Sequence, residues 1–289
     1  NIIYELASKK TESQVERLRI LANITDEILK ESFKKIKVGD TEREISLLTN
    51  NIMNDKMRKI ISRKLYNIVD FDVAWDNCPI VLTGENLAKG GHSLPSEKKL
   101  KCGDTIYFDF GIKAVFEDGE SLYTDMQRMG YALKDGESMP PKSVMKVFKT
   151  LVDAIEEGIE NCKPGVLAYK IDDIVREKIL SSGYINYNHA TGHPVGLAVH
   201  DIGAVISTRG SKRARLPLIE NGIYSIQMSS NNQRIVQVLG DQKSNESPIS
   251  VWNYNKNITQ KFQITYLNDG YYQIKHCYSG KVLDIYGSA

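Results

Sequence analysis

The sequence predicts an α+β protein of two unequal parts, and three observations lead to this prediction. A helix, a glycine-containing turn and a second helix occur twice, beginning near residues 11 and 143, and strand-like segments follow each pair. Aromatic and β-branched runs in the middle of the chain read as half-buried strands. From about residue 229 the composition changes to Asn, Gln, Ser and Tyr with short strands, which indicates an all-β appendage. We therefore expect one domain over residues 1–228 and a smaller one over 229–289.

Both helical pairs are predicted from apolar periodicity and helix start signals. Within residues 11–36, apolar side chains recur at helical spacing from Val15 to Ile28, and the turn KVGD separates this helix from the next. Thr41 precedes two nearby glutamates and is a suitable start for that second helix. In the second half, residues 143–160 and a helix that ends at about Ser181 repeat the arrangement around KPG. The repeat predicts a duplicated ααβ unit.

Two carboxylates are predicted to lie side by side on one sheet. Residues 105–111 (TIYFDFG) read as a strand whose apolar side chains face one way, so Asp109 faces the other way. Residues 122–131 (LYTDMQRMGY) read as a second strand that carries Asp125, and the Asp-Gly pair at 118–119 between them is a hairpin signal. Alternatively, either aspartate faces solvent at an edge, or Asp125 pairs with Arg128.

Three of the five histidines lie in residues 189–200, HATGHPVGLAVH. The glycines and the proline in this segment argue against a helix, so we expect a strand, a tight bend and a second strand. Such a bend brings imidazoles to one end of a sheet, where they can ligate metal or move protons. Together with the two aspartates they would form a mixed oxygen and nitrogen site suited to manganese, cobalt, iron or zinc. The alternative is three unrelated histidines.

Five motifs, in this order, resemble the pita-bread metallopeptidases: methionine aminopeptidases, Xaa-Pro aminopeptidases, prolidases and creatinases. The motifs are GGHSLPS at 90–96, GDTIYFDFG at 103–111, YTDMQRMGY at 123–131, HATGHPVGLAVHD at 189–201 and ENGIYSIQ at 220–227. The arrangement most resembles the Xaa-Pro aminopeptidase and prolidase branch, because His189 precedes the Gly-His pair. The resemblance covers about residues 5–228 and implies a pita-bread fold with the site between its two halves.

The resemblance also implies roles for particular residues. Asp109, Asp125 and His193 would be ligands of one or two divalent ions, such as Mn, Co or Zn. Such ions lower the pKa of a bound water and polarise the peptide carbonyl. His200 would be the catalytic histidine that steadies the oxyanion or relays protons. The last two roles concern the substrate: His92 would contact it near the scissile amide, and His189 would line its pocket.

Two departures from the family pattern concern the late ligands. Gln227 replaces the first late glutamate ligand, and a glutamine can offer a neutral oxygen but cannot bridge cations or act as a base. The last glutamate is missing from the apolar run at 234–239, where an acid is expected. A single cation is therefore favoured over two. A catalytically inactive pita-bread domain that binds peptide or protein is the alternative to a peptidase of short, Xaa-Pro-type peptides.

The tail resembles ricin-type β-trefoil lectin repeats at 249–264 and 269–287, with one complete repeat and part of another. Trp252, Gln260 and Asp284 are its candidate carbohydrate-binding residues; the alternative is that Trp252 and Phe262 are simply core. A third functional hypothesis is therefore a fusion directed to glycans. Both modules are expected to stop short of a closed fold, as in a truncated or recombined chain, and the open sheet edge predicts association of copies.

The bulk properties exclude some partners. A formal charge of +2 over 289 residues makes no case for nucleic acid, and we expect the basic run at 209–215 to be a solvated loop. Four scattered cysteines form no CxxC spacing, and no apolar run is long enough to span a membrane. The start lacks the apolar core of a signal peptide, which favours the cytoplasm for the peptidase part, while the lectin-like tail is compatible with an extracellular protein. Short peptides are the expected partners.

Overall fold

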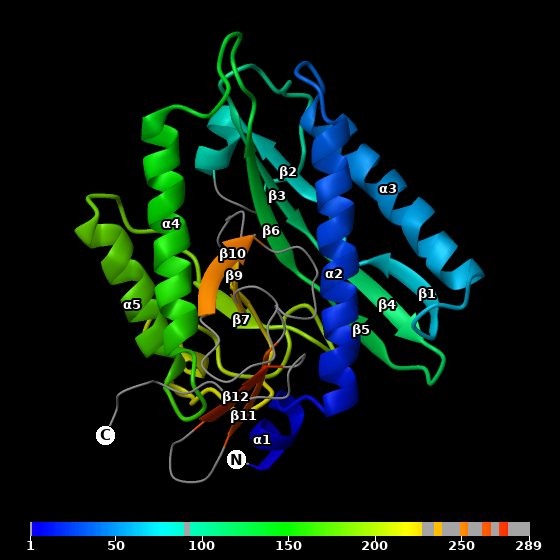
Figure 1. The fold of residues 1–289 in the computed structure, drawn as a ribbon, viewed down its shortest axis with the longest axis vertical. Coiled ribbons are helices and arrows are strands. Elements are labelled where there is room, and N and C mark those ends of the chain that lie inside the picture. Colours follow the sequence, from blue (N-terminus) through cyan, green and yellow to red (C-terminus); the bar gives the residue numbers. More distant parts are fainter. Residues whose placement is uncertain are drawn as a thin grey trace. The chain divides into compact units, whose positions relative to one another are not determined.

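The structure is a computed structural model. It describes residues 2–89 and 93–226, together with the backbone of four strands at 234–238, 249–253, 262–266 and 272–276. By its internal contacts the chain divides into two compact units, Asn1–Ser230 and Asn231–Ala289. The larger unit contains all the described helices and the first eight strands (Figure 1).

The elements follow one another in this order: α1 Ile2–Ser8, α2 Glu12–Lys35, α3 Glu42–Ser62, β1 Ile68–Val73, β2 Ile80–Thr83, η1 Gly84–Lys89, β3 Thr105–Phe110, β4 Ile112–Phe116, β5 Ser121–Tyr123, β6 Met126–Tyr131, α4 Lys142–Asn161, α5 Ala168–Ser181, β7 Gly192–Pro194, η2 Arg213–Arg215, β8 Tyr224–Ile226, β9 Arg234–Val238, β10 Ile249–Asn253, β11 Phe262–Tyr266 and β12 Tyr272–His276. None of the described helices is both long enough and apolar enough to cross a membrane.

The first helical pair is confirmed, and its start signals work as capping boxes. Thr11 accepts a hydrogen bond from the backbone of Gln14 while the Gln14 side chain accepts one from Thr11 N–H, and Thr41 and Glu44 do the same for α3. Each box satisfies two amide groups that a helix start otherwise leaves without partners. The apolar face of α2 then packs inward and Leu21 and Ile28 have no exposed surface.

The two aspartate-bearing segments do pair, but the connection between them differs from the prediction. β3 pairs antiparallel with β6 in the sheet β2-β3-β6, and Asp109 lies opposite Gln127. The predicted strand at 122–131 is two strands, β5 and β6, separated by Thr124 and Asp125. The Asp-Gly turn at 118–119 joins β4 to β5 in a second sheet, β1-β4-β5, and does not join the two aspartate strands. The predicted pairing is therefore right and only the predicted connection is wrong, because a hairpin signal identifies a local turn and not the strands that pair beyond it.

Gly111 marks the point where the chain passes from the first of these sheets to the second. A Cβ atom built there would lie 1.9 Å from the carbonyl oxygen of Thr124 and 2.8 Å from the Ala74 side chain. Only glycine therefore lets β3 and β4 follow each other directly at this position. The consequence for the site is that Asp125 is brought back beside the end of β3.

The main core lies between α2, α3 and the strands of these two sheets. Phe108 and Phe110 project from β3 into it and have no exposed surface. Burial of side chains of this size contributes about 1.5–3 kcal/mol each. This core holds β3 firmly while Asp109, on the opposite side of the strand, faces the site.

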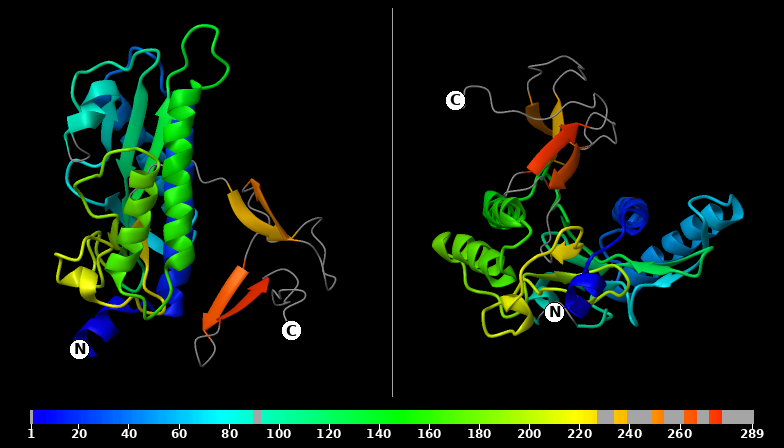
Figure 2. Two further views of the ribbon diagram at one scale, coloured as in Figure 1. Left: turned by 90° about the vertical axis from the view of Figure 1, so that its left-hand side faces the viewer. Right: turned by 90° about the horizontal axis from the view of Figure 1, so that it is seen from below.

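The second helical pair, α4 and α5, is also confirmed, and the two helices lie side by side (Figures 1 and 2). They are held by a small apolar cluster that contains Ala154, Val175 and Ile179. The histidine segment differs from its predicted form. Only Gly192–Pro194 is a strand, β7, and its partner is β8 rather than a second strand within the segment. A distant strand displaces the expected local hairpin, because β8 supplies the backbone partners that β7 needs.

The four strands described in the smaller unit form two antiparallel pairs. β9 pairs with β10, with Val236 opposite Val251, and β11 pairs with β12, with Ile264 opposite Ile274. Short strands of this kind agree with the predicted all-β composition of the tail. The trefoil arrangement itself stays a prediction.

Candidate active site

Two buried carboxylates form the centre of the candidate site. Asp109 lies on β3 and Asp125 immediately precedes β6, and they are 4% and 8% exposed. The side-chain amide of Gln127 lies between them: its nitrogen Nε2 is 2.7 Å from Oδ1 of Asp109 and 2.7 Å from Oδ1 of Asp125. The structure therefore brings together the two aspartates that the sequence predicted to be neighbours.

The electrostatics of the pair reflect this crowding. Burial raises the pKa of Asp109 well above its usual value, and the nearby charge of Asp125 raises it further. The hydrogen bond from Gln127 acts in the opposite direction, because it stabilises the ionised carboxylate. The two buried carboxyl groups are thus held side by side by a neutral donor.

His193 completes the cluster from the second half of the domain. Its Nε2 lies 3.0 Å from Oδ2 of Asp125, and its Nδ1 lies 3.1 Å from the carbonyl oxygen of Pro194. Burial alone lowers the pKa of this histidine, but the hydrogen bond and the charge of Asp125 outweigh burial, so the pKa is raised overall. The ring of His200 lies against it, with the ring centroids 4.4 Å apart, and His200 is exposed.

The alternative in which Asp125 pairs with Arg128 does not occur. Arg128 instead binds Asp26 on α2, with 2.9 Å between Nη2 and Oδ1. The backbone carbonyl of Asp125 accepts a hydrogen bond from the Ser225 hydroxyl of β8, at 3.1 Å. Asp125 is thereby fixed from both halves of the domain, and its carboxylate is directed to Gln127 and His193.

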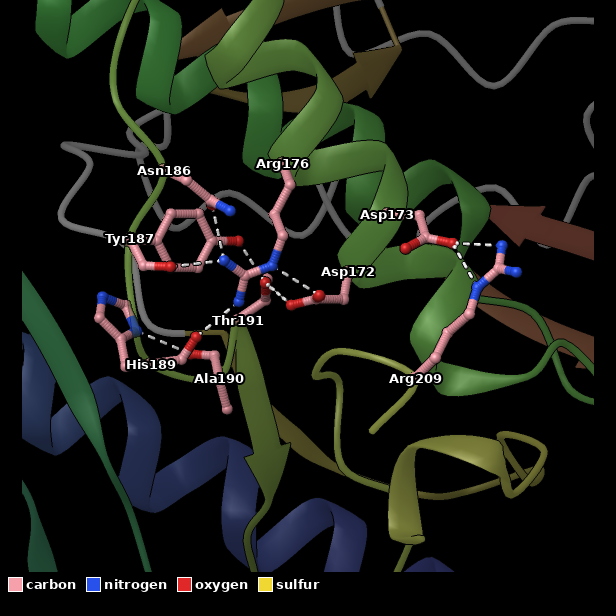
Figure 3. Close-up of polar contacts among 9 residues, drawn as sticks. All are labelled: Asp172, Asp173, Arg176, Asn186, Tyr187, His189, Ala190, Thr191 and Arg209. Atoms are coloured by element: carbon pink, nitrogen blue, oxygen red, sulfur yellow. Dashed lines mark hydrogen bonds and ion pairs between the residues drawn. The ribbon is translucent and has the colours of Figure 1, made fainter. Parts of the chain in front are cut away.

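A buried cluster on α5 positions the chain that leads to His193 (Figure 3). The guanidinium of Arg176 donates to Asp172 at 2.6 Å, to the carbonyl oxygens of Tyr187 and His189 at 2.6 Å each, and to the Asn186 side chain at 2.7 Å. It also stacks on the ring of Tyr187, 4.0 Å from its centroid. These bonds fix the segment 186–189 through the backbone carbonyls of Tyr187 and His189 and the side chain of Asn186. His189 itself is exposed, with its ring against Tyr187.

The loop that carries His200 is held at its far end by a buried ion pair. Nζ of Lys10 lies 3.0 Å from Oδ2 of Asp201, and the Lys10 side chain has no exposed surface. Lys10 passes so close to Gly196 that a Cβ there would lie 2.4 Å from its Cε. Arg213 donates to the carbonyl of Asp201, so one residue of the basic run at 209–215 is structural rather than simply solvated.

Some predicted residues lie outside the described part of the structure. These are His92, Gln227, Gln260 and Asp284, as well as the side chain of Trp252, of which only the backbone in β10 is described. The roles expected for them stay predictions.

With this geometry established, comparison with known proteins identifies the family. Residues 16–243 match the model of metallopeptidase family M24. This chain belongs to that family. Residues 215–289 match a second model, described as ricin-type beta-trefoil lectin domain-like, so the M24 region is followed by a ricin B lectin-like region.

The curated relatives of this M24 chain include uncharacterized peptidases of Staphylococcus species. An uncharacterized peptidase of Staphylococcus aureus is 29% identical over 225 residues, and one of Staphylococcus haemolyticus is 30% identical over the same length. In both cases the match covers 77% of this chain and 57% of the relative. The chain therefore spans somewhat more than half the length of the curated relatives it matches.

The M24 domain is also similar to solved structures. The X-Pro aminopeptidase from Thermotoga maritima has a TM-score of 0.63 and 27% identity, and the match covers 78% of this chain and 56% of that one. The prolidase from Pyrococcus furiosus has a TM-score of 0.62 at 24% identity, with 78% and 58% covered, and this likeness supports the fold alone. The mixed α and β content predicted for the pita-bread domain is confirmed by these neighbours.

Membership of a metallopeptidase family implies dependence on a divalent metal, and the donor types of this M24 site suit one. Two buried carboxylates and an imidazole form a mixed oxygen and nitrogen set, and the paired charges of Asp109 and Asp125 favour a cation between them. Across 2–89 and 93–226, however, no three His, Cys, Asp or Glu side chains gather so that they could hold an ion. Gln127 and His193 occupy the aspartate oxygens instead.

Three residues of this M24 site were not found from the sequence. Gln127 could have been, because it lies two residues after Asp125 and side chains on a strand repeat their direction every two residues. Arg176 and Lys10 gave no local signal. Arg176 lies within the amphipathic helix α5, and Lys10 precedes the amphipathic helix α2. Charged residues at such positions ordinarily face solvent.

Proposed function

We propose that this protein is a metal-dependent hydrolase of short peptides, an aminopeptidase or dipeptidase of the Xaa-Pro type. The observation that carries the proposal is the buried pair Asp109 and Asp125 with His193 at 3.0 Å, within an M24 domain. Buried carboxylates beside an imidazole are costly for a fold and are typical of functional sites. The Xaa-Pro preference is supported by the similarity of the domain to the X-Pro aminopeptidase from Thermotoga maritima.

In this proposal Asp109, Asp125 and His193 would hold one or two ions of Mn, Co or Zn, with Gln227 as a weaker neutral ligand. A bound ion supplies polarisation of the peptide carbonyl and an activated water. His200 is exposed beside His193 and can donate a hydrogen bond to an oxyanion that develops there. His92 would contact the substrate near the scissile amide.

The second wall of the substrate site would be the chain around His189. Its ring is exposed while its backbone is fixed by Arg176, so the side chain can meet a ligand without moving the segment. A side chain carried by a fixed backbone segment can hold a bound peptide in a reproducible orientation. This supports the role proposed for His189 in the peptide pocket.

A catalytically silent peptide-binding domain is the second candidate, and one observation favours it. Gln127 binds both aspartates at 2.7 Å, so the carboxylates are satisfied in the protein as it stands. The replacement of the family's glutamate ligand by Gln227 also favours a catalytically silent domain. In this candidate the site would bind peptides without cleaving them.

We propose a separate role for the tail, as a module that binds carbohydrate and directs the chain to glycans. The match of residues 215–289 to a ricin-type model supports it, and Trp252, Gln260 and Asp284 are the residues proposed to contact sugar. We place the boundary between the two domains at residues 228 and 229. Binding of the whole chain to a panel of immobilised sugars tests this role, and loss of binding in Trp252→Ala is the expected result.

The peptidase proposal is tested by hydrolysis of a panel of Xaa-Pro and Met-Xaa peptides with added Mn²⁺, Co²⁺ or Zn²⁺. We expect cleavage by the wild-type chain, no cleavage by Asp109→Asn, and unchanged cleavage by Asp55→Asn, which alters an exposed aspartate on α3. The pattern of cleaved peptides would identify the substrate branch. If no metal gives cleavage but the peptides bind, the silent candidate is correct and the hydrolase proposal is wrong.

A further inference from the structure

The side-chain amide of Gln127 binds both aspartates of this site. Gln127 is only 3% exposed, and its amide nitrogen makes two hydrogen bonds of 2.7 Å, one to each aspartate. A primary amide carries two N–H protons, so one nitrogen can serve both carboxylates at once. Bonds to ionised acceptors at this distance belong to the stronger class of hydrogen bonds in proteins.

The backbone fixes this arrangement. Gln127 is the direct partner of Asp109 in the antiparallel pair of β3 and β6, so the two side chains leave the same face of the sheet. Asp125 is two residues earlier on the same chain and shares that face. Three side chains on one sheet face are therefore neighbours by register, and the amide is held in place by the strand that carries it.

The amide occupies the place that a cation needs. Oδ1 of each aspartate already accepts a hydrogen bond from Gln127, and the remaining oxygen Oδ2 of Asp125 is paired with His193. A metal ion that coordinates both Oδ1 atoms has to displace the glutamine first. A neutral donor moderates the repulsion between the carboxylates without supplying a full positive charge.

We propose that Gln127 is an internal, uncharged occupant of the carboxylate pair. It holds Asp109 and Asp125 together when no metal is bound, and it competes with a divalent cation for the same oxygens, so it sets a low metal affinity for the site. The inference deepens the proposed function, because it concerns how the proposed metal centre is loaded. With this competitor, the site would bind metal only at a high concentration of the ion, whereas a site without it would be filled at a low concentration.

The test is direct titration of the full chain with Mn²⁺ by calorimetry, with no substrate present. Gln127→Met keeps the length of the side chain and removes the donor, so we expect its dissociation constant for Mn²⁺ to fall at least about tenfold. Gln127→Asn shortens the side chain, and its dissociation constant for Mn²⁺ should lie between those of the wild type and Gln127→Met. Gln14→Met is the matched control, because that amide also binds a carboxylate, Glu120 at 2.6 Å, but not this pair. Its affinity for Mn²⁺ should equal that of the wild type.

A second readout uses thermal unfolding in EDTA and in excess Mn²⁺. Without metal, Gln127→Met should unfold at a lower temperature than the wild type, and Mn²⁺ should raise its unfolding temperature by more. An unchanged or weaker Mn²⁺ affinity in both Gln127 variants, or no Mn²⁺ binding by any variant, overturns the inference. Peptide cleavage is scored separately. A tenfold change in affinity without any hydrolysis would reject the proposed function and leave the role of Gln127 in place.

Discussion

The cluster on α5 yields the sharpest test of how the site is positioned. Asp172 has no exposed surface, and it accepts hydrogen bonds from Arg176 at 2.6 Å and from the Thr191 hydroxyl at 2.5 Å. Asp172→Ala leaves the guanidinium with only neutral partners in a buried place. Breaking one member of a buried ion pair costs about 3–5 kcal/mol, because the other charge remains without compensation.

The expected shift follows from the size of the domain. For a domain of 150–250 residues each kcal/mol lowers the unfolding temperature by about 2–4 °C, so Asp172→Ala should lower it by roughly 6–20 °C. Circular dichroism at 222 nm is the suitable assay, because the described helices all lie in the larger unit. Peptide binding should weaken as well, since Arg176 fixes the backbone of His189.

The neighbouring residue provides a matched control. Asp173 pairs with Arg209 at 2.9 Å (Figure 3), but the two side chains are 44% and 69% exposed. An exposed pair of this kind contributes about 0–1 kcal/mol. Asp173→Ala should therefore unfold within a few degrees of the wild type. Equal unfolding temperatures for Asp172→Ala and Asp173→Ala would refute the view that α5 supports the histidine segment.

Two further predictions concern the sheet and the histidine. Gly111→Ala should prevent normal folding, because its Cβ would lie 1.9 Å from the carbonyl oxygen of Thr124. The control Gly210→Ala should be neutral, because the nearest atom to its Cβ is 3.9 Å away. Soluble yield and unfolding temperature are measured for both variants, and a normally stable Gly111→Ala would contradict the geometry. Because the pKa of His193 is raised in the folded protein, its pairing with Asp125 stabilises fully below about pH 6.5 and this stabilisation is lost as the pH rises through the raised pKa. The difference in unfolding free energy between wild type and His193→Gln, measured from pH 5 to 9 without metal, should shrink with rising pH; a difference that grows would refute the assignment.

Much of the fold could be predicted because the signals are local. The capping boxes at Thr11 and Thr41 join groups three residues apart, and both helices begin where these residues indicate. The alternation that set Asp109 apart from its apolar neighbours operates over adjacent residues of one strand. The hairpin at 118–119 was also a correct local turn. The sequence could not decide that this turn would join β4 and β5 of a second sheet and not the two strands that carry the aspartates.

The sequence alone therefore determined the family, the helical pairs and the two aspartates on one sheet face, since these depend on residue types and short spacings. Only the tertiary structure decided that Gln127 joins the aspartates, that His193 reaches Asp125, and that Lys10 and Arg176 hold the histidine segment. The physical reason is that most of these contacts join residues tens to hundreds of positions apart. Their partners are set by how sheets and helices pack, and packing brings together residues that no local pattern connects.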